Sequence, residues 1–154
     1  MREIRRRTDR LVDRDCVFCG IIRGESPCLQ VYEDSRVLAF ADINPVSDGH
    51  TLVVPKAHAD NLWVIPDKDL AAVHLASKKI LNALTAALDP TGVAVLQLNG
   101  DGANQEVRHY HIHLIPRMGG DPALPMTDWD QQPGNMERIE EIGQRIRKEL
   151  GRTD

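Results

Sequence analysis

Residues 109–116, His-Tyr-His-Ile-His-Leu-Ile-Pro, place three histidines at alternate positions in an otherwise apolar run. Successive side chains of a β-strand point to opposite faces, so a strand here would carry the imidazoles on one face and the apolar side chains on the other. The apolar face is expected to pack against a core. Because half of the six histidines in the chain lie in this one run, the imidazole face is expected to serve chemistry.

An imidazole suits several kinds of chemistry at neutral pH. Its ordinary pKa of about 6.5 leaves it mostly neutral at pH 7, so it can act as a nucleophile, a proton donor or a metal ligand. A solvated strand face that is merely rich in histidine is the alternative.

The spacing of apolar residues predicts an α+β fold. Strands are expected over residues 29–32, 36–41, 50–54, 93–98 and 109–115. Helices are expected over 18–23, over 69–88, and over 136–150 with Asn135 as N-cap. Short turns between the early strands favour antiparallel pairing. We therefore expect an antiparallel sheet of about five strands, flanked by one long helix and a C-terminal helix.

Composition limits the classes of protein and of partner. A chain of 154 residues with 42% hydrophobic content suits one core. Tyr32, Trp63 and Trp129 are expected in this core by default, with surface and interface positions as the alternatives. With no membrane-length apolar run and no signal-peptide pattern, the expected location is the cytoplasm. A net charge of −4 argues against nucleic acid as a partner. The expected organisation is a charged arm (1–14), a main domain (15–118), and a loop and helix (119–154) that pack on the same domain.

Two of the three cysteines, Cys16 and Cys19, form a C-x-x-C pair. Such a pair is typical of a metal site or of a thiol-redox centre. The stretch before it is charged and does not resemble the buried strand that precedes a thioredoxin-type centre. Both interpretations stay open on spacing alone.

The histidine run resembles the signature of the histidine triad (HIT) superfamily, His-φ-His-φ-His-φ-φ with φ apolar. The similarity includes residues 32–45, 49–58 and 99–107, and so extends from about Cys16 to Arg117. The resemblance implies an antiparallel α+β fold, often found as a homodimer paired across the long helix. The resemblance also implies that the protein needs no organic cofactor.

The resemblance also implies roles for individual residues. His111 corresponds to the nucleophile of the family, His113 to a histidine that contacts the phosphate, and His50 to an assisting histidine. Asn99 and Gln105 correspond to amides that line the phosphate site.

The nucleoside part of a substrate is expected near the end of the second strand. The carboxylate of Asp42 can accept hydrogen bonds from ribose hydroxyls, and apolar neighbours such as Ile43 suit a base. The resemblance implies the same use of Asp42, with Ile22 and Phe40 against a purine. Without it, residues 42–45 are an ordinary exit from a strand into a turn.

Four residues are expected to form a structural zinc site with the Cys₂His₂ ligand set typical of such sites. Some zinc-bearing relatives of the family share this arrangement. The four ligands are Cys16, Cys19, His58 and His109.

These observations predict an enzyme. We expect a nucleotide hydrolase or transferase that cleaves at the α-phosphate through a covalent nucleotidyl-His111 intermediate. The resemblance implies dinucleoside polyphosphates or nucleoside phosphoramidates as substrates. Two other functions are a nucleotide-binding sensor or interaction module with little turnover, and a metal or thiol-redox protein that uses Cys16 and Cys19.

Overall fold

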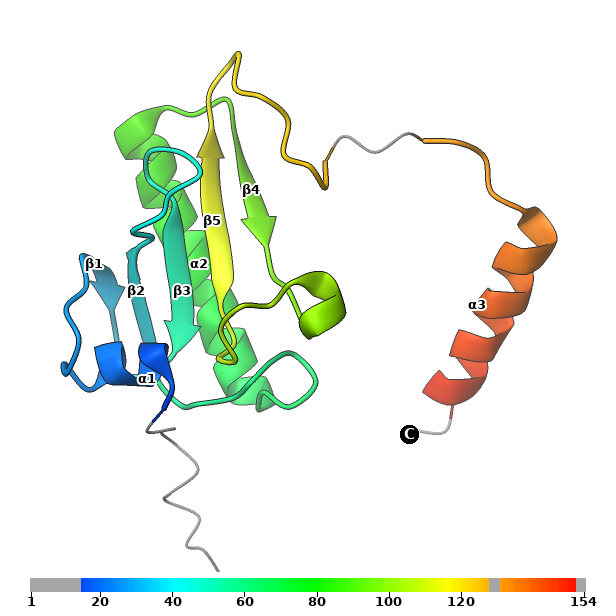
Figure 1. Cartoon of the computed structure of the whole chain (residues 1–154), viewed down its shortest axis with the longest axis horizontal. Coiled ribbons are helices and arrows are strands. Elements are labelled where there is room, and N and C mark those ends of the chain that lie inside the picture. The colour runs from blue at the N-terminus through cyan, green and yellow to red at the C-terminus, as the bar shows by residue number, and fades with distance from the viewer. Residues whose placement is uncertain (1–14, 128–130, 152–154) are drawn as a thin grey trace, which may run out of the picture. The chain divides into compact units, whose positions relative to one another are not determined.

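Five antiparallel strands form one sheet, in the order β1-β2-β3-β5-β4 (Figure 1). The strands are β1 (Gln30–Glu33), β2 (Val37–Ala41), β3 (Thr51–Pro55), β4 (Gly92–Leu96) and β5 (Ile112–Arg117). The predicted class and strand number are confirmed, and four of the five strands lie within two residues of their expected bounds.

The histidine run differs from its prediction at its start. Strand β5 begins only at Ile112, because the backbone N–H of Tyr110 donates to the carbonyl of Ala59 in a loop, at 2.7 Å, and not to a neighbouring strand. The side chains still alternate. Tyr110, Ile112 and Leu114 are buried in the main core, as the pattern predicts.

The structure is a computed structural model that describes residues 15–127 and 131–151. The predicted arm, 1–14, and Trp129 lie outside the described residues. The chain divides after Asp121 into two units, which are described here one at a time.

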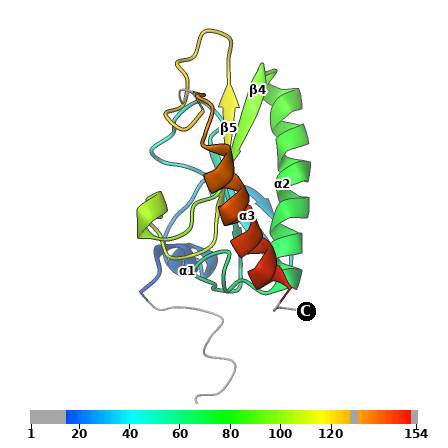
Figure 2. The same ribbon diagram turned by 90° about the vertical axis from the view of Figure 1, so that its right-hand side faces the viewer.

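Helices lie on both sides of the sheet in the first unit. The long helix α2 (Asp67–Leu88) covers one face, and α1 (Val17–Ile22) lies on the other side (Figure 2). The short 3-10 helix η1 (Asp101–Ala103) follows β4. The main core is formed between α2 and the first of these faces. A second cluster lies on the histidine face, where Phe18 of α1 packs against side chains of β2 and β3.

Helix α2 starts at Asp67, two residues before its expected start at 69, and ends at Leu88 as expected. It follows Pro66, and its C-cap, Asp89, adopts a left-handed conformation with φ 47°. The carboxylate of Asp69 in the first turn is buried and accepts a hydrogen bond from the guanidinium of Arg36 at 3.1 Å. This pair ties the start of α2 to the turn before β2.

The second unit contains helix α3 (Met136–Leu150), which matches its predicted bounds. Asn135 is its N-cap, since the side-chain oxygen accepts a hydrogen bond from the backbone N–H of Arg138 at 3.0 Å. Packing of residues 119–154 on the main domain stays a prediction. Among the residues that the structure describes, no helix combines the length and hydrophobicity needed to cross a membrane.

Gly49, which precedes His50, is expected to be intolerant of substitution. Its φ is +85°, and an added Cβ would lie 2.5 Å from Leu88 Cδ1. Gly49→Ala should therefore lower the free energy of unfolding by about 1–3 kcal/mol, measured by urea denaturation. Gly92→Ala is the matched control, because a Cβ at Gly92 meets nothing within 4 Å. Equal effects of the two substitutions would contradict this account.

Candidate functional site

One ring nitrogen of His111, Nε2, is unprotonated and has a free lone pair. Its Nδ1 lies 2.6 Å from the backbone carbonyl oxygen of His109. A carbonyl oxygen only accepts, so Nδ1 carries the proton, and Nε2 of the neutral ring is left unprotonated. The ring is mostly buried, with 8% of the residue exposed, and it packs edge-on against Phe18 at 5.2 Å between centroids.

A chain of hydrogen bonds orients His50 and His113. The backbone N–H of Val46 donates to His50 Nδ1 at 3.0 Å, which places the proton of the neutral ring on Nε2. That N–H donates to His113 Nδ1 at 2.9 Å. His113 therefore carries its own proton on Nε2, available to a substrate oxygen. The rings of His111 and His113 lie 5.0 Å apart.

All three imidazoles are shifted towards their neutral forms. Burial lowers the pKa of His50 and of His111. Burial, with the neighbouring imidazoles of His111 and His50, lowers the pKa of His113 to about 4. At neutral pH the site therefore holds an unprotonated nucleophilic nitrogen and neutral donors.

Asp42 lies beside this row of histidines. Its Oδ2 is 3.5 Å from His50 Nε2, and its Oδ1 accepts a hydrogen bond from the backbone N–H of Asn44 at 2.8 Å. Of the other residues expected at the nucleoside, Ile43 is exposed, Ile22 is half-buried and Phe40 is buried against Phe18, with ring centroids 5.4 Å apart. Phe18 was not expected here from sequence, although it lies inside the C-x-x-C pair.

The loop after β4 is organised by its own side chains. Gln105 is buried; its amide oxygen accepts from the backbone N–H of Gly100 at 2.9 Å, and its Nε2 donates to the carbonyls of Asp60 and Val107 at 2.6 and 3.0 Å. Asn99 forms a reciprocal amide pair with Gln97, at 2.7 and 2.8 Å. The structure thus places Gln105 inside the loop.

Most backbone N–H groups of this loop already donate to acceptors within it. The N–H groups of Gly100, Ala103 and Asn104 donate to acceptors within the loop. Its conformation is fixed by these bonds and by a left-handed Asn104, with φ 62°. No sequence pattern marks Gln97 as the partner of Asn99.

The four predicted metal ligands lie together, with all ligand atoms within 4.8 Å of one another. His109 Nδ1 lies 3.2 Å from His58 Nδ1, 3.4 Å from Cys16 Sγ and 3.5 Å from Cys19 Sγ. A tetrahedral zinc ion with ordinary bond lengths separates such ligand atoms by about 3.3–3.8 Å. The spacing therefore fits a four-coordinate metal ion held entirely by protein.

The hydrogen bonds of the two histidine ligands point their lone pairs into the cluster. His109 Nε2 donates to the carbonyl of Pro55 at 2.8 Å, and His58 Nε2 contacts the carboxylate of Asp60 at 2.8 Å. With Nε2 protonated in each ring, both Nδ1 atoms face the thiols unprotonated, as metal ligation requires. Asp60 was not singled out from sequence, although it lies two residues after His58.

Comparison with known proteins assigns most of the chain to one family. A family model described as the HIT domain matches residues 23–120. The adenylylsulfatase HINT3 of Arabidopsis thaliana is 45% identical over 106 residues, which cover 69% of this chain and 54% of that protein. The adenosine 5′-monophosphoramidase hnt1 of Schizosaccharomyces pombe is 37% identical over 135 residues, which cover 88% of this chain and 98% of that protein.

A solved structure is also similar. The zinc-bound histidine triad family protein of Mycobacterium smegmatis superposes with a TM-score of 0.67 at 34% identity, covering 80% of this chain and 86% of that chain.

Acid is expected to destabilise the fold through His113. The pKa of His113 is about 4 in the folded chain and about 6.5 when unfolded. Between these values the unfolded chain binds a proton that the folded chain does not. Stabilisation present above pH 6.5 is therefore lost as the pH falls towards 4.

Two measurements check this expectation. Titration of the imidazole NMR signals should find His113 neutral at pH 5, and the free energy of unfolding of His113→Gln should fall less steeply than that of the wild type between pH 6.5 and 4. An ordinary titration of His113 near pH 6.5 would contradict it.

Proposed function

The chain belongs to the HIT domain family, and we propose that it is a nucleotide hydrolase or transferase that cleaves at the α-phosphate of its substrate. The observation that carries the proposal is the free Nε2 of His111. A neutral nitrogen that is aimed by a carbonyl and held next to hydrogen-bond donors is suited to nucleophilic attack on phosphorus. The printed names of the two relatives, an adenylylsulfatase and an adenosine 5′-monophosphoramidase, support this chemistry.

The proposed reaction has two steps. In the first, the lone pair of His111 Nε2 forms a bond to the α-phosphorus while the bond to the leaving group breaks. That group departs with the bonding electrons, and an amine leaving group also takes a proton from solvent. In the second, the oxygen of a water molecule bonds to phosphorus, the electrons of the N–P bond return to Nε2, and a proton is released to solvent. The products are a nucleoside monophosphate and the expelled group.

Neighbouring residues are assigned by the atoms that they offer. The Nε2–H of His113 donates to a phosphate oxygen, where negative charge grows in the transition state. His50 keeps His113 in the required tautomer. Asp42 accepts from the ribose hydroxyls, with Ile22, Phe40 and Ile43 towards the base, and Asn99 faces the phosphate. Gln105 supports the loop that carries Asn99, through two hydrogen bonds within the loop and one to the carbonyl of Asp60.

We assign Cys16, Cys19, His58 and His109 to a structural zinc ion. When bound, zinc would supply a rigid link between α1 and the segment that carries the nucleophile. The main-chain carbonyl of His109 holds the His111 ring, so a fixed His109 also fixes the nucleophile. The convergence of two thiols and two imidazole lone pairs supports a metal site over a thiol-redox pair.

The proposal extends to a homodimer. The expected contact across the long helix α2 has apolar surface available at Leu75, which is 71% exposed. β4 lies at one edge of the sheet, where the outer backbone groups of the strand can also pair with a second copy. Val95 on this strand is 55% exposed, which leaves apolar surface for such a contact. Location in the cytoplasm remains a prediction from the sequence.

His111→Ala is expected to lose nearly all turnover, since the proposed covalent intermediate forms on Nε2 of this ring. Incubation of the wild type with a dinucleoside polyphosphate or an adenosine phosphoramidate, followed by mass spectrometry, should trap a nucleotidyl adduct at His111. The variant should show no adduct, and its kcat/KM should fall at least about a thousandfold.

Lys78→Ala, which replaces an exposed side chain of α2, serves as the control and should keep the adduct. Tight nucleotide binding by the wild type with no adduct would favour the sensor function. Unchanged function in His111→Ala, together with sensitivity to a chelator or an oxidant, would favour a metal or redox protein.

Cys19→Ser is expected to lose zinc and stability together. Cys19 is 1% exposed and lies within 3.5 Å of both histidine ligands. Metal analysis should find less than one zinc per chain, and the Tm should fall. The ratio of kcat/KM between two substrates should stay unchanged at temperatures where the variant is folded. Cys28→Ser, outside the cluster, is the matched control. Equal zinc content in all three proteins would exclude the site.

A further inference from the structure

An exposed tryptophan lies on the loop between β3 and α2. Trp63 is 75% exposed, although a core position was expected for it, and its neighbours Leu62 and Val64 are also exposed. The loop is nevertheless well held. The backbone N–H of Trp63 donates to the side chain of Asn61 at 3.2 Å, and Ile65 is buried. An aromatic side chain of this size, presented to water by a fixed loop, suits contact with a ligand.

Three hydrogen bonds join this loop to the elements of the site. The carbonyl of Ala59 accepts from the N–H of Tyr110 at 2.7 Å, and the carbonyl of Asp60 accepts from Gln105 at 2.6 Å. The N–H of Leu62 donates to the side chain of Asn99 at 2.8 Å. Trp63 is thus fixed relative to the histidine run and to the loop after β4.

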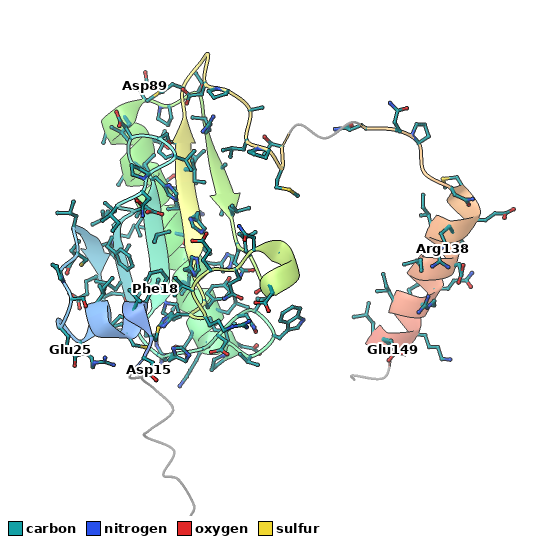
Figure 3. All side chains as sticks on the ribbon, in the orientation of Figure 1. Asp15, Phe18, Glu25, Asp89, Arg138 and Glu149 are labelled. Atoms are coloured by element: carbon teal, nitrogen blue, oxygen red, sulfur yellow. The ribbon has the colours of Figure 1, made fainter. Side chains whose placement is uncertain are left out.

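The indole packs directly on the loop after β4. A Cβ added to Gly100 would lie 3.5 and 3.6 Å from Cζ3 and Cη2 of Trp63. Gly100 itself has a φ of +81°, a conformation that glycine adopts readily. The aromatic ring therefore lies beside the loop that carries Asn99. Figure 3 shows the side chains of this unit on the ribbon.

The strand order places the residues assigned to the nucleoside and the loop that carries Asn99 on opposite sides of the histidine strand. Asp42, at the nucleoside, follows β2, whereas Asn99 follows β4, and these strands lie on opposite sides of the β3–β5 pair. The residue pairing agrees, since Ala41 pairs with Thr51 on β3 and Leu96 pairs with His113 on β5. A phosphorus atom bound at His111 would thus have its nucleoside towards β2 and its remaining substituent towards the β4 side.

We infer that Trp63 determines specificity for the expelled group, by stacking on a planar base or other aromatic ring in that group. The inference rests on the proposed function. It names the substrate class as nucleotides whose leaving group itself carries a ring, such as dinucleoside polyphosphates. Stacking of one base on an aromatic side chain changes affinity about five- to a hundredfold.

Kinetics with two leaving groups test this role. Trp63→Ala should lower kcat/KM for a diadenosine polyphosphate about tenfold, mainly through KM, and should change kcat/KM for adenosine 5′-phosphoramidate, which expels ammonia, less than twofold. Trp63→Phe should restore most of the loss. Val64→Ala, at an exposed position of the same loop, is the control and should act like the wild type.

An equal loss of kcat/KM on both substrates would mean that Trp63 has a structural role only. An unchanged kcat/KM on both would mean that Trp63 does not contact the substrate. Both results overturn the inference.

A binding measurement separates this inference from the proposed function. In a Trp129→Phe background Trp63 is the single tryptophan, and a non-hydrolysable dinucleotide should quench its fluorescence more than AMP does. Stronger quenching by the dinucleotide without a His111 adduct would contradict the proposed function and support the contact with Trp63. An adduct at His111 with equal quenching by both ligands would support the proposed function and contradict the contact with Trp63.

Discussion

The site depends on the fact that an imidazole ring has two nitrogens, and that fixing the proton on one of them decides what the other can do. Carbonyl oxygens fix the proton in two rings of the histidine run. His109 donates from Nε2 to Pro55, which turns its Nδ1 towards the thiols, whereas His111 donates from Nδ1 to the carbonyl of His109, which leaves its Nε2 free. Two neighbouring histidines on one face thus acquire different chemical roles without any difference in residue type.

The sequence was sufficient to predict the sheet, α2, α3 and the grouping of two cysteines with two histidines, because each depends on a local pattern or on a resemblance with specific residues. It was not sufficient for the loops. Gln105 lies inside its loop because Asp60, 45 residues away, offers a carbonyl. Trp63 is exposed because its loop is held by Asn99 rather than by burial of the indole. Such bonds join distant segments, and neither composition nor spacing records them.

Asp60 links the Cys₂His₂ cluster to the loop after β4. Its carboxylate contacts His58, while its backbone carbonyl accepts from Gln105, whose amide oxygen in turn holds the N–H of Gly100. One residue therefore contacts His58 of the cluster with its side chain and orients the loop with its main chain. The position of the cluster and the conformation of the loop are therefore coupled through Asp60.

The sheet order has a consequence for how such proteins diversify. Loops after β2 and after β4 contribute to the site from opposite sides of the strand pair that bears the histidines. Substitutions in one loop leave the hydrogen bonds of the other loop intact. On the proposed function, related proteins can therefore change their specificity for the expelled group while nucleotide binding and the position of His111 stay the same.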